Sequence, residues 1–223
     1  MVTVAVRLPC FRLAAALRHV PDPDAAAFLI ERTGRRRVLE ATDAAARAGV
    51  RPGMALREAT RAVPRAAIVL DDAARAGRAW RRTLDVLARL PARVEAGEPG
   101  LAFVRIPRGD AAARWFALVR TIVEPLGLPV RCGAGPNRFT ALVAAHRAAD
   151  AVCRPGREAA FVADAPLELL DLDEDVALRL RLLGVRTLGQ LAALPPAYLL
   201  RFGTAAVGWR ALAHGHDASV AQN

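Results

Sequence analysis

The segment 183–188, Leu-Gly-Val-Arg-Thr-Leu, is the part of this sequence best suited to holding a ligand. It stands between two short predicted helices, and its glycine allows a tight turn between them. Such a turn can direct backbone N–H groups at the start of the second helix toward a phosphate, which is bound without reading a base sequence. A plain helical hairpin closed by a glycine is the alternative. The residues predicted to contact a nucleic-acid backbone are Arg181, Gly184, Val185, Arg186 and Thr187.

The other polar clusters of the chain favour structural roles. Asp71 and Asp72 precede a long predicted helix, where carboxylates commonly cap the first turn. The acidic run at 171–175 lies at another helix start and lacks the glycine and the spacing of a calcium loop. The three cysteines are widely spaced and show no paired metal-ligand spacing, so we predict no metal site and no bound cofactor.

A glycine-containing segment, Gly133-Ala134-Gly135-Pro136, has a superficial likeness to the start of a dinucleotide-binding loop. Pro136 removes an amide donor, however, and the third glycine of such loops is missing. A phosphate loop of the lysine-containing kind is excluded because the chain has no lysine. We therefore interpret this segment as a structural turn.

Charge and composition narrow the class of partner. The formal net charge is +10 and the sequence pI is about 11.3, so the protein should attract polyanions, with nucleic acid first and an anionic membrane surface second. All the basic charge comes from arginine, and a compositional bias toward arginine is the alternative explanation. No apolar stretch reaches membrane-spanning length and residues 1–6 do not resemble a signal peptide, so we expect a cytoplasmic protein without membrane contact.

The order of predicted elements indicates an α+β sheet domain with additions. Strand-like runs at 2–8, 101–106 and 129–132 alternate with helical runs at 11–19, 72–90 and 110–126, whereas the region from 161 onward contains only short helices. This pattern divides the chain as a palm-like domain over 1–19 and 76–160, a fingers-like insertion over 20–75, a helix-hairpin-helix thumb-like domain over 161–217, and a disordered tail over 218–223.

Taken in order, these segments resemble the core of the Y-family, or translesion, DNA polymerases. The individual matches are modest, but their shared order extends from residue 1 to about 217. The likeness implies an α+β palm of mixed or antiparallel strands with helices, a small fingers insertion and a helix-hairpin-helix thumb. It is carried by the runs VLEAT at 38–42, GVRPGM at 49–54, GLPVRCGAGPNRF at 127–139, APL at 165–167 and LAHGHD at 212–217.

The resemblance also implies where metal ligands should stand, and this chain departs from the pattern there. Active relatives place carboxylates at the end of the first strand and in a later palm strand, where they hold two divalent ions. The corresponding positions here are Arg7 and Pro9 in the first strand and Gly100 and Leu101 in the later one. These positions cannot supply the carboxylates, so the resemblance implies loss of catalysis.

The expected nucleotide-binding positions are altered as well. The fingers tyrosine and arginine that hold a triphosphate in active relatives correspond to Asp43 and Ala46, and the palm lysine corresponds to Leu142. An aspartate about 4 Å from a phosphate would cost about 4 kcal/mol at an effective dielectric near 20. Arg138, at the start of the same palm helix as Leu142, is retained as a possible contact for DNA.

The pattern of losses is similar to that of the ImuB-like group, which implies a non-catalytic DNA-binding adaptor in DNA repair and SOS translesion mutagenesis. The implied partners are primer–template or damaged DNA, an error-prone replicative-type polymerase, the sliding clamp and a RecA-like accessory protein, in a bacterial, nucleoid-associated setting. Family members continue into a little-finger domain, which this sequence does not show. The alternatives are an active error-prone polymerase that uses Mg²⁺ held by displaced carboxylates such as Glu95 or Glu98, and a truncated remnant without activity.

Overall fold

The computed structural model describes residues 1–19, 21–107, 109–147 and 150–217, and it divides into two compact units. One unit contains residues 1–7, 103–117 and 131 onward, and the other contains 8–102 and 118–130. The tail predicted to be disordered at 218–223 lies outside the described residues. Among the described residues, no helix combines the length and the apolar character needed to cross a bilayer.

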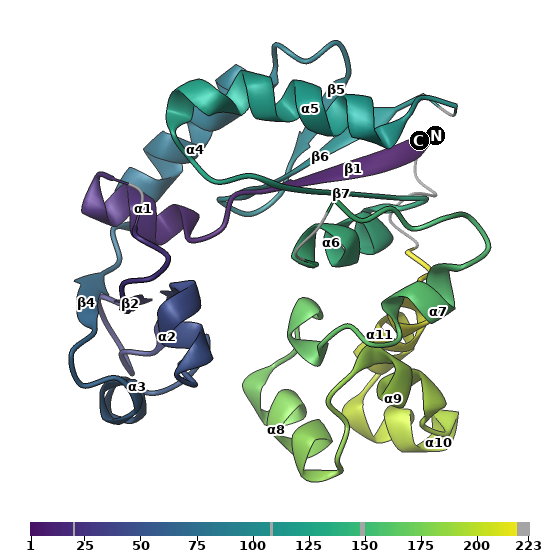
Figure 1. Cartoon of the computed structure of the whole chain (residues 1–223). Helices are drawn as coiled ribbons and strands as arrows, with labels where there is room; N and C mark the ends of the chain where they lie inside the picture. The colour runs from purple at the N-terminus through teal and green to yellow at the C-terminus, as the bar shows by residue number, and fades with distance from the viewer. Residues whose placement is uncertain (20, 108, 148–149, 218–223) are drawn as a thin grey trace. The chain divides into compact units, whose positions relative to one another are not determined.

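The larger of the two sheets has four strands in the order β5-β6-β1-β7 (Figure 1). Val4, Ala5 and Val6 in β1 are fully buried, as expected for a strand covered on both faces. Strands β1 and β7 are antiparallel, with Thr3 opposite Gly135 and Arg7 opposite Arg131. The strands are β1 (Val2–Arg7), β5 (Arg93–Ala96), β6 (Leu101–Ile106) and β7 (Arg131–Gly135).

Helix α6 (Arg138–His146) packs closely against β7. Asn137 caps it through a capping box with Thr140. A Cβ added to Gly133 would lie 2.0 Å from the Ala145 backbone nitrogen, so only glycine permits this approach. The segment interpreted as a structural turn is therefore the end of a strand, and its glycines serve the contact between strand and helix.

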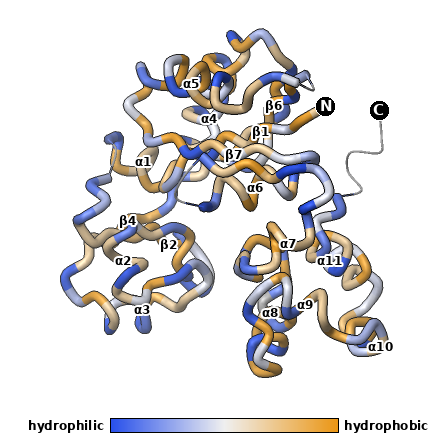
Figure 2. The backbone as a smooth tube through the Cα atoms, turned by 45° about the vertical axis from the view of Figure 1, so that its right-hand side comes forward, coloured by the Kyte–Doolittle hydropathy of each residue, from blue (hydrophilic) through white to orange (hydrophobic). Residues whose placement is uncertain are grey.

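The helices that follow α6 have their own apolar core. Val162, Leu180, Leu188 and Leu191 are fully buried in it. Hydrophobic and hydrophilic residues alternate along α8 (Figure 2), and of its leucines Leu180 is buried whereas Leu178 and Leu182 are exposed. The elements of this region are α7 (Glu158–Val162), η2 (Leu167–Leu169), α8 (Glu174–Leu182), α9 (Leu188–Ala193), α10 (Pro196–Leu199), η3 (Leu200–Phe202) and α11 (Ala205–Ala213).

The second unit contains a small sheet of order β3-β2-β4, in which β2 pairs antiparallel with β3 and parallel with β4. Phe28, Ile30 and Val38 are buried in a core of their own. Thr42 caps α2 by accepting a hydrogen bond from the Ala45 N–H. The elements are α1 (Phe11–Leu17), β2 (Ala27–Ile30), β3 (Val38–Ala41), α2 (Asp43–Arg47), α3 (Leu56–Ala62) and β4 (Ala67–Leu70).

Helix α4 (Ala73–Leu87) follows β4, and α1 packs against it. The Phe11 and Trp80 rings meet edge to face with centroids 5.3 Å apart. The chain later forms α5 (Ala112–Val123) and the short η1 (Glu124–Leu126) before β7 begins. These elements confirm the predicted α+β class, while β5 was not predicted because its Arg-Val-Glu-Ala sequence carries a weak strand signal.

Candidate nucleic-acid interface

The predicted hairpin forms between α8 and α9, and Gly184 makes its turn with φ of +80°. The Gly184 N–H donates to the Arg181 carbonyl at 3.0 Å, and the Val185 N–H donates to the Leu180 carbonyl at 2.9 Å. Val185 is only 4% exposed, so its side chain anchors the turn in the core. These two amides are thus used to close α8 and are not directed at a ligand.

The next two amides are paired with a side chain. The N–H groups of Arg186 and Thr187 donate to Gln190 Oε1 at 2.7 and 3.2 Å, and the Gln190 N–H donates to Thr187 Oγ1 at 3.3 Å. Gln190 Oε1 therefore lies where an anion would accept from the start of α9. A phosphate that binds these amides must replace this oxygen or share the amides with it.

The arginine side chains of the hairpin remain accessible. Arg186 is exposed, and Arg181 lies 3.9 Å from Glu168 with about half of each side chain in solvent (52% and 57%). Such an exposed pair is weak, so a phosphate can compete for Arg181. Arg138 is instead the first residue of α6, and its guanidinium lies 4.3 Å above the ring of Phe103 in β6.

At the end of β1, the Arg7 guanidinium contacts His146 Nδ1 at 3.2 Å. Burial, followed by the charges of Arg7 and Arg131, lowers the pKa of His146, and Glu168 opposes this shift. The His146 ring is therefore neutral at pH 7, and its Nδ1 accepts the Arg7 N–H. The strand end where the resemblance leads us to expect a metal-binding carboxylate thus carries a cation.

Gly100 has no room for a side chain. It adopts a φ of +97°, and an added Cβ would lie 2.8 Å from Phe11 Cβ and 3.1 Å from the Leu8 carbonyl oxygen. The Leu8 N–H also donates to the Gly100 carbonyl at 2.8 Å, which brings Pro9 and Gly100 into the same neighbourhood. Leu101 follows in β6 and is partly buried. A carboxylate at position 100 would therefore require the loop to rearrange, and Leu101 has an apolar side chain.

The carboxylates nearest in sequence are Glu95, which lies in β5, and Glu98, which lies in the β5–β6 connection. The Glu95 side chain is 17% exposed and lies 3.5 Å from Arg93, whereas Glu98 is exposed. Within the described ranges, no three His, Cys, Asp or Glu side chains gather closely enough to hold a metal ion. The residues present therefore do not fit the two-ion site of an active polymerase.

A family model and several solved structures match this chain. The model described as the impB/mucB/samB family matches residues 8–146, which is more than half of the chain. The chain belongs to the impB/mucB/samB family. The comparison with curated proteins found no match to this chain.

The similar structures are DNA polymerases. DinB from Sulfolobus solfataricus gives a TM-score of 0.70 at 20% identity, covering 96% of this chain and 67% of that protein. A DinB family error-prone DNA polymerase from the same organism gives 0.69 at 19% identity, covering 96% and 66%. An insertion ternary complex of Dbh DNA polymerase gives 0.68 at 20%, covering 96% and 67%. The predicted likeness to the fold of Y-family DNA polymerases is thereby confirmed.

The expected nucleotide-binding positions of this family member lie on two helices. Asp43 and Ala46 are both exposed on α2, and Leu142 is partly buried on α6. Neither Ala46 nor Leu142 can carry charge, so these positions lack the cations that a triphosphate requires.

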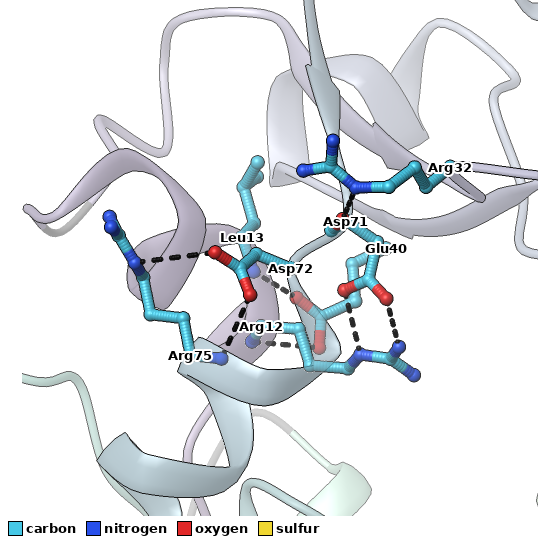
Figure 3. A network of polar contacts seen from close by, with 7 residues as sticks. All are labelled: Arg12, Leu13, Arg32, Glu40, Asp71, Asp72 and Arg75. Atoms are coloured by element: carbon cyan, nitrogen blue, oxygen red, sulfur yellow. Dashed lines mark hydrogen bonds and ion pairs between the residues drawn. The ribbon is translucent and has the colours of Figure 1, made fainter.

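The family member also holds the start of α1 with its own carboxylates (Figure 3). Glu40 accepts the N–H groups of Arg12 and Leu13 at 3.3 and 2.8 Å. The Arg12 guanidinium makes two hydrogen bonds to Asp71, at 3.3 and 2.6 Å. Sequence reasoning missed this network because its members lie tens of residues apart and no local spacing signals it.

The two adjacent aspartates have different roles. Asp72 caps α4 by accepting the Arg75 N–H at 2.9 Å, and this hydrogen bond is the main reason that the pKa of Asp72 is lowered. Asp71 caps nothing and pairs with Arg12, where its side chain is 11% exposed against 32% for Arg12. The predicted capping role is therefore confirmed for Asp72 and wrong for Asp71.

This difference predicts a ranking of stabilities. Arg12→Ala should lower the free energy of unfolding by about 2–3 kcal/mol, because it leaves the Asp71 carboxylate buried without its ion pair. Asp72→Ala removes a cap at the neighbouring position and should cost about 1 kcal/mol. Urea unfolding of both variants measures the difference. An Arg12→Ala variant that loses no more stability than Asp72→Ala would show that the pair contributes little.

Proposed function

We propose that this chain is a non-catalytic, ImuB-like member of the impB/mucB/samB family that binds DNA as an adaptor in DNA repair and translesion mutagenesis. The observation that supports the proposal most strongly is that the positions expected to bind metal ions carry no carboxylates. Arg7 places a cation at the end of β1, and Gly100 has an added Cβ only 2.8 Å from Phe11. Two divalent ions need several carboxylate oxygens, and none of the matched positions Arg7, Pro9, Gly100 and Leu101 carries a carboxylate.

The proposed DNA contact is the α8–α9 hairpin. Arg181 and Arg186 would bind phosphate oxygens, and the Arg186 and Thr187 amides would join them when Gln190 Oε1 moves away. Such contacts follow the backbone and do not select a base sequence. The formal net charge of +10 adds a favourable long-range attraction for the polyanion.

The adaptor role implies further proposals. The palm-like, fingers-like and thumb-like divisions drawn from the sequence would form the DNA-facing frame. The proposed protein partners are an error-prone replicative-type polymerase, a sliding clamp and a RecA-like accessory protein, at the bacterial nucleoid. Arg138 would assist DNA binding only after leaving its place above Phe103.

Binding to a primer–template duplex across a range of salt concentrations tests the proposal. Each phosphate that an arginine neutralises should contribute about −0.9 to the slope of log K against log salt concentration. We expect measurable binding at low salt and little dependence on DNA sequence. The slope of log K against log salt concentration should be about −1.8 or steeper if both hairpin arginines contact phosphates. No binding at low salt, or binding that ignores salt, would refute the proposed function.

A further inference from the structure

A second strongly charged surface lies on α4. Arg78, Arg81 and Arg82 are exposed on this helix, and Arg89 is exposed just beyond its C-terminal residue Leu87. Within the part of the chain that the structure describes, their side chains make no hydrogen bond and no ion pair, in contrast to Arg75, which pairs with Asp72 at 3.6 Å. These arginines are called the α4 arginines below.

The helix geometry places the charges together. At 100° per residue, Arg78, Arg81 and Arg82 fall within about 100° of the helix circumference. The buried residues Trp80 and Leu87 lie on the opposite side and fix this orientation. The exposed face of α4 therefore presents these cations together on a helix that is anchored by its buried face.

Counter-charges and apolar residues are scarce on this face. Asp85 is the carboxylate that shares it, and no ion pair joins Asp85 to the α4 arginines among the described residues. The remaining exposed neighbours, such as Ala88, are small. A stable protein interface normally needs large apolar or aromatic anchors at its centre, and this surface offers none. A row of cations without anchors fits the phosphates of a nucleic acid better than an acidic protein.

We infer that the α4 arginines form a second binding surface for the phosphate backbone of a DNA duplex. This inference rests on the DNA binding proposed above and adds a second duplex to the one at the hairpin. The hairpin belongs to one compact unit and α4 to the other, so the two surfaces share no residue. The inference therefore predicts that one chain captures two separate DNA duplexes.

A two-duplex capture experiment tests the inference. The protein is bound to an immobilised duplex, and a fluorescent duplex of unrelated sequence is then added. The test variant carries Arg78→Gln, Arg81→Gln, Arg82→Gln and Arg89→Gln, because glutamine keeps helix propensity close to that of arginine. The control carries Arg18→Gln, Arg65→Gln, Arg154→Gln and Arg157→Gln, which removes the same charge from exposed positions outside α4.

We expect the wild type and the control to capture the fluorescent duplex, and the α4 variant to lose capture about tenfold or more while it still binds the immobilised duplex. Equal capture by the α4 variant and the wild type overturns the inference, as does equal loss in the control. A wild type that binds the first duplex but captures no second one overturns this inference alone and leaves the proposed function standing. A wild type that binds no duplex overturns both.

Discussion

Gly133→Ala should destabilise the protein by at least about 3 kcal/mol, the largest stability change that we expect from any single methyl group in this chain. The added Cβ would lie 2.0 Å from the Ala145 nitrogen and 2.4 Å from the Ala144 carbonyl carbon. Both atoms belong to the backbone of α6, so no side-chain rotation can relieve the overlap. Helix α6 must move away from β7, which disturbs the four-stranded sheet.

A second glycine provides the control for this prediction. Gly77 lies within α4, and an added Cβ meets no atom within 4 Å. Gly77→Ala should therefore stabilise the protein by about 1 kcal/mol through helix propensity. Thermal and urea unfolding of the two variants should show opposite signs. A Gly133→Ala protein as stable as the wild type would mean that α6 does not pack on β7 as described.

Replacing both hairpin arginines should produce the largest change in DNA binding. Arg181→Gln with Arg186→Gln removes two phosphate contacts, so the slope of log K against log salt concentration should become shallower by about 1.8. Binding should weaken to a similar extent for every DNA sequence, because backbone contacts carry no sequence information. The side chains are exposed, so the free energy of unfolding should change by less than about 0.5 kcal/mol.

Gln190→Ala distinguishes the contribution of the backbone amides to DNA binding from that of the arginine side chains, and it is measured in the same DNA-binding assay. Loss of Oε1 frees the Arg186 and Thr187 amides, so DNA binding should be retained or tightened although stability falls by about 1 kcal/mol. Asn137→Ala removes the other capping box, at α6, and serves as the control for lost stability without a change at the hairpin. Weaker DNA binding in Gln190→Ala alone would show that the amides do not take part.

Local signals in the sequence predicted most of the elements correctly. The capping box of Thr187 with Gln190 and the glycine turn at Gly184 form as expected, because both depend on residues within a few positions of one another. The residue range of β7 was harder to predict from the sequence. Glycines favour turns in isolation, and only the close approach of α6 explains why Gly133 and Gly135 lie in a strand.

Long-range polar contacts could not be predicted. Glu40 reaches the start of α1 and Asp71 reaches Arg12 because the strands β3 and β4 fold back beside α1, and nothing in the spacing of these residues reveals it. The α8–α9 hairpin shows both outcomes. Its backbone path was predictable, but the pairing of its amides with Gln190 Oε1 depends on a rotamer that a sequence does not specify.

The most direct test of the account is a Mn²⁺ titration of the protein with primer–template DNA and a deoxynucleoside triphosphate, in which electron paramagnetic resonance measures free Mn²⁺. We expect the protein to bind no additional Mn²⁺, so the free Mn²⁺ signal should equal the signal measured with DNA and nucleotide alone. Two additional ions bound per chain, lost in Glu95→Gln or Glu98→Gln, would contradict this expectation and indicate a working polymerase centre built from β5 and the β5–β6 connection.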